Sequence, residues 1–379
     1  MKALRTPITQ TRRDAWTEVN LSNIEFNINE IKKVLAPGVK IMAIVKADAY
    51  GHGAAMVSKT LSASGVSMFG VAAVDEGIQL RMTDIKKPVL ILGPTPNWAV
   101  ASAVENDLDI TIFSEAHLDD CIEVAQKLQK RVNIHIKIDT GMHRIGVDYR
   151  NAPELIAKAE KAREVFIKGI FSHLACAEDT EASQVQINRW NEIINHLDKK
   201  PPYLHFTNSA ALIAYKNIHY NLVRCGLEIY GLKPDLPPGI NHLPLKQVMA
   251  LRGRINHLHK AMPGEGVSYG YSYNVCDKEV TIATLPVGYA DGVSRRLSNK
   301  IYGSTNGMKV PQIGNITMDQ MMLDVSEIND IAIGDIITLL DADNTTSMSI
   351  DDWAKILGTI NYEVPCLLKV RLPRVYTSD

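Results

Sequence analysis

The chain has 379 residues, of which 46% are hydrophobic and 22% charged, and its formal net charge is −1. This length suits two domains, one of them large, and the composition is typical of a folded protein rather than a disordered one. The balanced charge excludes a strongly basic surface for nucleic acid or anionic membranes, and no apolar run reaches the roughly 18 residues of a membrane span.

The N-terminal segment, MKALRTPITQTRRDAW, has basic residues with no apolar run behind them. We therefore expect no secretory signal peptide and a cytoplasmic protein. The five cysteines are scattered and lack CxxC spacing, which favours free thiols over disulfides or a zinc site. No metal is expected.

Up to residue 244, short apolar runs alternate with amphipathic helical segments. The first such segment carries Ile24, Ile28, Ile31 and Leu35 on one face. The apolar runs are predicted strands: Ile41–Val45, Met68–Ala72, Val89–Leu92, Ile110–Phe113, Val132–Ile138, Val165–Phe171, Tyr203–Phe206 and the weaker Leu222–Val223. Buried strands separated by helices predict a parallel sheet. Eight such units would close into a (β/α)8 TIM-type barrel, and an open doubly wound sheet is the alternative that periodicity leaves.

After residue 244 the pattern changes to short β-type segments separated by Gly, Pro, Asn and Asp. The predicted strands there include Val280–Thr284, Ile336–Leu340 and Lys369–Val375. The fold class is therefore α/β, with a barrel domain over residues 1–244 followed by a mostly-β domain over residues 245–379. A first strand near residues 15–20 is able to pair with the second domain.

Polar residues follow the apolar runs of the first half. They are Lys46 after the first run, Lys137 and Arg144 at the fifth, His173 after the sixth, Asn208 and Ser209 after the seventh, and Arg224 and Gly226 at the eighth. Each alone has an ordinary explanation, such as a surface lysine, a structural histidine or a helix-capping serine. In a barrel, however, all of them would surround the carboxyl-end mouth, where active sites lie.

These residue types suit a site for pyridoxal 5′-phosphate (PLP). Such a site needs a lysine amine for a Schiff base, a phosphate cradle, a partner for the pyridine nitrogen and acid–base groups near the substrate. Backbone N–H groups at helix starts suit the phosphate, and Ser209 and Gly226 stand where they would supply them.

Several motifs in chain order resemble those of the alanine racemases, a PLP-dependent family. They are AIVKADAYGHG (43–53), KIDTGMHRIG (137–146), GIFSHLACAE (169–178), VRCGLEIYGL (223–232), VSYG (267–270), PVGYADG (286–292), MDQMM (318–322) and NYEVPC (361–366). The resemblance extends over nearly the whole chain. It implies a barrel plus a β domain, in agreement with the elements above.

The resemblance implies that Lys46 binds PLP and is one catalytic base. Tyr269 is then the opposing base, supplied by the partner subunit of a homodimer with composite active sites. The implied cofactor-binding residues are Lys46, Tyr50, His173, Asn208, Ser209, Arg224, Gly226, Leu227 and Tyr362. The implied substrate-binding residues are Arg144, Met318 and Tyr289. Lys137 corresponds to a lysine that is carbamylated in some members of the family.

Two bases on opposite faces suit racemisation, which removes the α-proton from one face of the substrate and returns it to the other. The predicted function is interconversion of L-alanine and D-alanine, with D-alanine supplied for peptidoglycan. A serine or broader-specificity racemase is the alternative, because a small apolar pocket rejects one added hydroxyl poorly. A non-enzymatic PLP carrier would be a lone barrel, which the second domain contradicts.

Three positions depart from the family pattern. Asn315 stands where the family usually has arginine, Glu178 where it commonly has aspartate, and Tyr271 where it has a small residue. In relatives the first two positions meet at the substrate corridor. We therefore expect this corridor to differ from that of other members.

Overall fold

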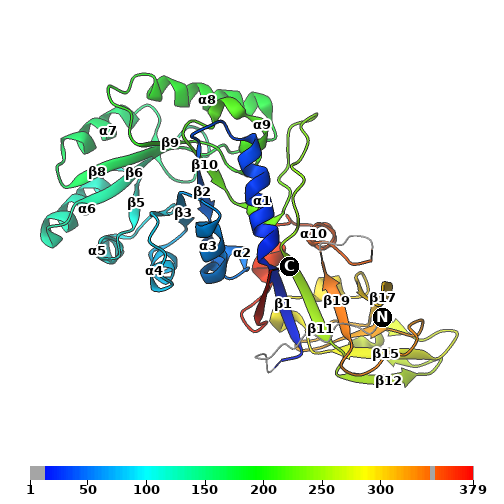
Figure 1. Cartoon of the computed structure of the whole chain (residues 1–379). Helices are drawn as coiled ribbons and strands as arrows, with labels where there is room; N and C mark the ends of the chain where they lie inside the picture. Colours follow the sequence, from blue (N-terminus) through cyan, green and yellow to red (C-terminus); the bar gives the residue numbers. More distant parts are fainter. Residues whose placement is uncertain (1–12, 342–345, 379) are drawn as a thin grey trace. The chain divides into compact units, whose positions relative to one another are not determined.

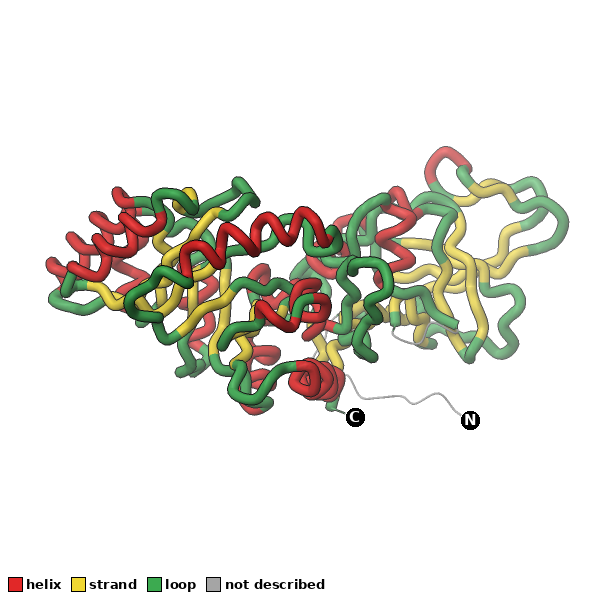
Figure 2. Tube along the Cα trace, turned by 90° about the horizontal axis from the view of Figure 1, so that it is seen from above, coloured by secondary structure: helices red, strands yellow, loops and turns green. Residues whose placement is uncertain are grey.

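The computed structural model describes residues 13–341 and 346–378. These residues form two compact units. The barrel unit contains Ile24–Ala49 and Gly53–Leu245. The second unit contains the described residues up to Asn23, the short stretch Tyr50–His52 and the described residues from Lys246 onward. Figure 2 shows that helices surround the strands of the barrel unit, whereas the second unit consists mainly of strands and loops.

Eight parallel strands form the sheet of the barrel unit, in the order β10-β2-β3-β4-β5-β6-β8-β9 (Figure 1). They are β2 (Lys40–Ile44), β3 (Met68–Val71), β4 (Val89–Ile91), β5 (Asp109–Ile112), β6 (Val132–Asp139), β8 (Val165–Phe171), β9 (Tyr203–His205) and β10 (Leu222–Cys225). The two outermost strands, β9 and β10, are also in contact. The sheet is thus a nearly closed barrel, which confirms the predicted barrel over the open sheet.

Helices follow the strands and cover the outside of the barrel. They are α1 (Leu21–Val34), α3 (Ala54–Ala63), α4 (Val74–Met82), α5 (Asn97–Glu105), α6 (Glu115–Leu128), α7 (Ala152–Lys161), α8 (Thr180–Ile194) and α9 (Ser209–Ala214), with the 3-10 turns η1 (Lys216–Ile218) and η2 (Leu227–Tyr230). The predicted apolar face of α1 is buried at Ile24, Ile28 and Ile31. Side-chain caps define several starts: the Asp179 carboxylate, for example, accepts two backbone N–H bonds at the start of α8.

The second unit contains a nine-stranded sheet, in the order β12-β15-β18-β17-β16-β19-β11-β1-β20. The strands are β1 (Ala15–Asn20), β11 (Met249–Arg254), β12 (His257–Ala261), β15 (Val280–Leu285), β16 (Tyr302–Thr305), β17 (Met308–Ile313), β18 (Met321–Asp324), β19 (Ile336–Leu340) and β20 (Arg374–Thr377). The first strand, β1, pairs antiparallel with β11 and parallel with β20. The mostly-β second domain is therefore confirmed.

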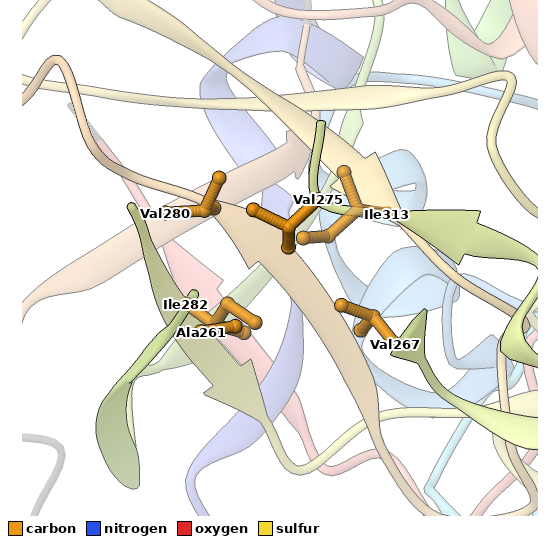
Figure 3. Packing of buried hydrophobic residues seen from close by; sticks show 6 residues of the cluster. All are labelled: Ala261, Val267, Val275, Val280, Ile282 and Ile313. Carbon is orange, nitrogen blue, oxygen red and sulfur yellow. The ribbon is translucent and has the colours of Figure 1, made fainter. Parts of the chain in front are cut away.

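Smaller elements complete the two units. In the barrel unit β7 (Val147–Asp148) pairs with β6. The second unit adds the hairpin of β13 (Gly266–Val267) and β14 (Tyr273–Asn274), the 3-10 turns η3 (Tyr269–Tyr271), η4 (Tyr289–Asp291) and η5 (Arg295–Leu297), and the helices α10 (Ile350–Leu357) and α11 (Glu363–Leu367). An apolar cluster shown in Figure 3 packs the hairpin onto the sheet; it consists of Ala261, Val267, Val275, Val280, Ile282 and Ile313.

One strand prediction was wrong in its bounds. The sequence predicted a strand over Lys369–Val375, but β20 begins only at Arg374. The preceding residues form a turn in which the Leu372 N–H donates to the Lys369 carbonyl at 3.0 Å, and Pro373 has no N–H for a ladder. None of the helices in the described ranges is long and apolar enough to cross a membrane.

Candidate active site at the carboxyl end of the barrel

Lys46 follows β2 and begins α2 (Lys46–Tyr50), a short turn with left-handed geometry. The four residues after Lys46 all have φ between 52° and 54°. This conformation costs roughly 1–2 kcal/mol for each residue that has a Cβ. The turn is fastened by a bond of 2.7 Å from the Ala47 N–H to the Glu76 carboxylate, and the Asp48 carboxylate accepts from the start of α3. These bonds fix the backbone on which the lysine stands.

Arg224 on β10 is buried and held by both terminal nitrogens of its guanidinium. Nη1 donates to the His205 carbonyl at 2.9 Å, and Nη2 donates to the carbonyls of Ser172 at 2.8 Å and Phe206 at 3.1 Å. Each terminal nitrogen also lies 3.1 Å from a histidine Nδ1, His205 for Nη1 and His173 for Nη2. No described residue accepts a bond from Nε–H, so this donor is left for a ligand.

The contact with Arg224 determines the protonation of His173. A guanidinium only donates, so His173 accepts at Nδ1 and carries its proton on Nε2. The pKa of His173 is held well below its ordinary value, mainly by burial and then by the charges of Arg224 and Lys137. Arg144 and Lys46 act in the same direction. His173 is therefore neutral, and the charges of all four of these residues act to lower its pKa.

Lys137 lies buried on β6 in the same positive surroundings. Its ammonium is 4.9 Å from the centroid of the Phe171 ring, over which the Arg224 guanidinium also lies at 5.5 Å. Burial lowers the pKa of Lys137 well below its ordinary value, and Arg224 and Arg144 lower it further while Asp139 opposes them. In the described part of the chain no carboxylate forms an ion pair with Lys137, Arg144 or Arg224. This end of the barrel therefore gathers basic side chains that have no carboxylate partner among the described residues.

The two predicted phosphate-binding turns are joined by a hydrogen bond. Asn208 caps α9 through its side-chain oxygen, and Gly226 precedes η2. The Leu227 N–H donates to the Ser209 hydroxyl at 3.1 Å. The starts of α9 and η2 thus lie side by side, although 18 residues separate them in the sequence.

Glu228, which the sequence did not single out, lies next to these turns. It is fully buried, and among the described residues neither carboxylate oxygen has a hydrogen-bond partner of normal geometry. Burial raises its pKa from the ordinary 4.5 to about 7, although the Ser209 hydroxyl and nearby backbone N–H groups oppose the shift. It lies within the motif VRCGLEIYGL (223–232), but only its burial in the fold distinguishes it.

Three predicted residues of the second unit lie in neighbouring loops. Tyr269 is 74% exposed, and its carbonyl accepts from the Asn315 side chain at 2.7 Å. Asn315, one of the departures from the family pattern, therefore supports the loop that carries Tyr269. The backbone N–H groups of Tyr289 and the next residue donate to the carbonyls of Thr317 and Met318, both at 3.0 Å. This close approach requires Gly288, since a Cβ there would lie 2.2 Å from the Thr317 carbonyl oxygen.

The remaining predicted positions lie as follows. Tyr50 belongs to the short stretch in the second unit, where a Cβ on the adjacent Gly51 would lie 2.4 Å from the carbonyl oxygen of Pro365 in α11. Tyr362 precedes α11. The Glu178 carboxylate accepts from the Cys176 thiol at 3.1 Å. Tyr271 is 70% exposed. In the described ranges no group of three His, Cys, Asp or Glu side chains is arranged to hold a metal.

Comparisons with known proteins agree over nearly the whole chain. The alanine racemase N-terminal domain family matches residues 19–234, and the C-terminal domain family matches residues 248–376. The alanine racemase of a Nostoc species is 40% identical over 375 residues, covering 95% of each chain. The structure of alanine racemase from Clostridium difficile 630 superposes with a TM-score of 0.92 at 35% identity, covering 98% of this chain and 97% of the other.

A further solved structure has a ligand named with it. Alanine racemase from Bacillus anthracis with bound L-Ala-P superposes with a TM-score of 0.89 at 32% identity, covering 98% of this chain and 96% of the other. Matches of this extent and identity include both units, so they show common ancestry of the whole chain rather than of the barrel alone.

Proposed function

The chain belongs to the alanine racemase family, and from this premise we propose that it is an isomerase that interconverts L-alanine and D-alanine with PLP. The observation that carries the proposal is the charge at the carboxyl end of the barrel. There the side chains of Lys137, Arg144 and Arg224 form no ion pair with a described carboxylate. A phosphate dianion and a substrate carboxylate would both be attracted to it.

The residues present fit PLP. Lys46 supplies the amine that holds the cofactor. The starts of α9 and η2, joined by the bond from the Leu227 N–H to the Ser209 hydroxyl, would place backbone N–H groups and this hydroxyl near its phosphate. Tyr50, Asn208, Gly226 and Tyr362 complete the proposed phosphate contacts. When bound, PLP supplies the electron-withdrawing ring that makes the α-proton of the amino acid acidic.

Arg224 is proposed to face the pyridine nitrogen with its Nε–H. A guanidinium is essentially always charged, so it donates a hydrogen bond but does not give up a proton. Arg224 would thereby keep the pyridine nitrogen of bound PLP unprotonated, which would weaken the withdrawal of electrons from the substrate. This should discourage transamination and decarboxylation and favour simple return of the proton. The bonds to both terminal nitrogens keep the guanidinium from turning away.

Two bases are proposed to move the proton. Lys46 takes or returns it on one face of the α-carbon, and Tyr269 on the other. An ordinary tyrosine pKa near 10 must be lowered for this task, and the Nε2–H of His173 would stabilise the phenolate. Arg144 and the backbone at Met318 are proposed to orient the substrate carboxylate and the cofactor, and Tyr289 to line the entrance.

We further propose a homodimer with composite sites, in which Tyr269 serves the Lys46 of the partner subunit. The proposal rests on the family resemblance. It is supported by large side chains left exposed around Tyr269 in the second unit, since Tyr271 is 70% and Met318 52% exposed. A cytoplasmic location and a role in supplying D-alanine for peptidoglycan are also proposed on the resemblance alone.

The test of the function is purification without added cofactor, followed by a visible spectrum and racemase assays. We expect a yellow protein that borohydride reduction labels at Lys46, and racemisation of alanine faster than that of serine in a panel of amino acids. A colourless protein that does not take up added PLP would refute the proposal. Faster turnover of serine would identify serine as the preferred substrate and leave the proposed reaction type unchanged.

Lys137 is expected to be carbamylated. Its lowered pKa increases the fraction of neutral amine. This amine attacks the carbon of CO2, forms an N–C bond as one C=O π bond becomes C–O⁻, and releases a proton to solvent. The resulting carbamate would place a negative charge beside Arg224 and Arg144, in place of a third positive charge. Protein equilibrated with 13C-bicarbonate should show a carbamate carbon signal in NMR. The signal should be absent from Lys137→Ala, and its persistence there would assign it to another amine.

A further inference from the structure

A row of polar side chains inside the barrel connects Arg224 on β10 with Asp109 on β5. His205 Nδ1 lies 3.1 Å from Arg224, and His205 Nε2 lies 2.9 Å from Nδ1 of His135. His135 Nε2 in turn lies 3.7 Å from the Asp109 carboxylate, which accepts two bonds from the Lys168 ammonium at 2.7 and 3.0 Å. Both histidines and Asp109 are buried, and 16% of the Lys168 side chain is exposed.

Arg224 sets the direction of the hydrogen bonds along this row. Because the guanidinium only donates, His205 accepts at Nδ1 and must carry its proton on Nε2. His205 therefore donates to Nδ1 of His135. His135, accepting at Nδ1, carries its own proton on Nε2, which faces Asp109. The two neutral tautomers are thus coupled, and a change at the Asp109 end reaches Arg224.

The packing of the barrel interior holds both histidine rings of the row in place. A Cβ on Gly169 would lie 2.3 Å from Nδ1 of His135, so only glycine leaves room for the ring. The His135 ring stacks on Tyr203 with centroids 6.3 Å apart, and the His205 ring stacks on Phe171 at 4.7 Å. Each ring is consequently held in one orientation.

Burial, together with the charges around the row, keeps both histidines neutral. Burial is the main cause that lowers the pKa of His135 and of His205. Asp109 raises the pKa of His135, while Lys168 lowers it; for His205 the lowering charges are Arg224, His135 and Lys137. The ammonium of Lys168 therefore offsets part of the rise that the Asp109 carboxylate causes in the pKa of His135.

We propose that Asp109 and Lys168 are positioning residues, which act through His135 and His205 to hold Arg224 in place for its ligand. With both charges present, His135 stays neutral and the hydrogen bonds all run from Arg224 toward Asp109. The inference rests on the proposed function, because it takes the ligand of Arg224 to be the cofactor. Asp109 begins β5, so the row controls the site from the opposite end of the strands.

Replacing Lys168 alone should disrupt the hydrogen bonds of the row, because His135 then becomes doubly protonated. With Asp109 uncompensated, His135 gains a second proton as the pH falls and becomes a donor at Nδ1. His205 must then accept at Nε2 and carry its proton on Nδ1, where it faces the donors of Arg224 and the bond between them is lost. Removing both charges in Asp109→Asn/Lys168→Met should leave His135 neutral, and the carbonyl of the new amide would still face its Nε2–H.

The experiment compares Lys168→Met, Lys168→Arg and Asp109→Asn/Lys168→Met with the unchanged protein. Ring 15N shifts of histidine-labelled protein report the tautomers, and equilibrium titration with PLP reports affinity, both at about pH 6 and about pH 8.5. We expect Lys168→Met to show doubly protonated His135 at the lower pH and PLP binding about tenfold weaker, the size of one lost hydrogen bond. Lys168→Arg and the double variant should bind PLP within about threefold of the unchanged protein at both values.

The possible outcomes test the positioning role and the proposed function separately. Equal, pH-independent weakening in Lys168→Met and the double variant would mean that the pair only supports the fold and would overturn the positioning role. Protonation of His135 without any change in PLP affinity would overturn it as well. Unchanged protein that binds no PLP would instead refute the proposed function, while the ring 15N shifts would still show whether the row exists.

Discussion

Replacing Tyr269 by phenylalanine is expected to lower racemisation about 10²–10⁴-fold, the usual loss for a positioned general base. The proposed site keeps Lys46 in this variant, so the colour of the bound cofactor should remain. By analogy with the family, Lys46 is expected to act on D-alanine and Tyr269 on L-alanine. In deuterated water the variant should therefore still exchange the α-proton of D-alanine and nearly cease to exchange that of L-alanine.

The exchange pattern separates the explanations for a slow variant. Equal loss of exchange from both enantiomers would mean that Tyr269 organises the site rather than acting as a base. Unchanged racemisation would mean that a single group serves both faces. Tyr271→Phe is the matched control, because it removes a hydroxyl from a neighbouring exposed tyrosine to which no base role is assigned.

The same variant tests the composite sites. Mixed with inactive Lys46→Ala protein under conditions that exchange subunits, Tyr269→Phe protein should recover part of its activity. One site of each hybrid dimer would then contain an intact Lys46 and an intact Tyr269 from different subunits. Hybrids that form and remain inactive would place both bases in one subunit.

Replacing Glu228 by glutamine is expected to stabilise the protein at high pH. The pKa of Glu228 is raised in the folded state, from 4.5 to about 7. The proton on this carboxyl thus favours folding below pH 4.5, and this contribution is lost as the pH rises through about 7. Above that pH the buried charge costs about 3 kcal/mol, which the neutral amide would remove.

Thermal and urea unfolding at about pH 5 and about pH 8 measure this effect. The variant should be distinctly more stable than the unchanged protein at the higher pH, and the difference should shrink at the lower one. Glu160→Gln on the exposed face of α7 is the control, and it should change stability little at either pH. A stabilisation that does not depend on pH would show that packing, rather than ionisation of Glu228, is responsible.

Much of the architecture followed from local patterns in the sequence. All eight predicted runs overlap a strand of the barrel, because a strand buried on both faces is mostly apolar. The change of pattern after residue 244 likewise predicted a mostly-β domain. The order of polar residues after the runs pointed to one end of the barrel, since parallel strands all end on the same side.

Other features depended on groups that only the folded chain brings together. The strand predicted over Lys369–Val375 failed because the backbone before Arg374 is engaged in a turn. The left-handed turn after Lys46 contains no glycine until Gly51, so its composition does not predict this conformation. It persists because a distant carboxylate, Glu76, binds its backbone.

The protonation states were also decided by the tertiary structure alone. His135 and His205 are 70 residues apart in sequence, and each by itself is an ordinary strand histidine. Their tautomers follow only once Arg224 is known to donate to one end of the pair. Glu228 is another case, since an acidic residue in a short turn is normally solvated, and burial is what raises its pKa. Sequence patterns determine which segments are buried, whereas the charge that a buried group carries depends on what lies opposite it.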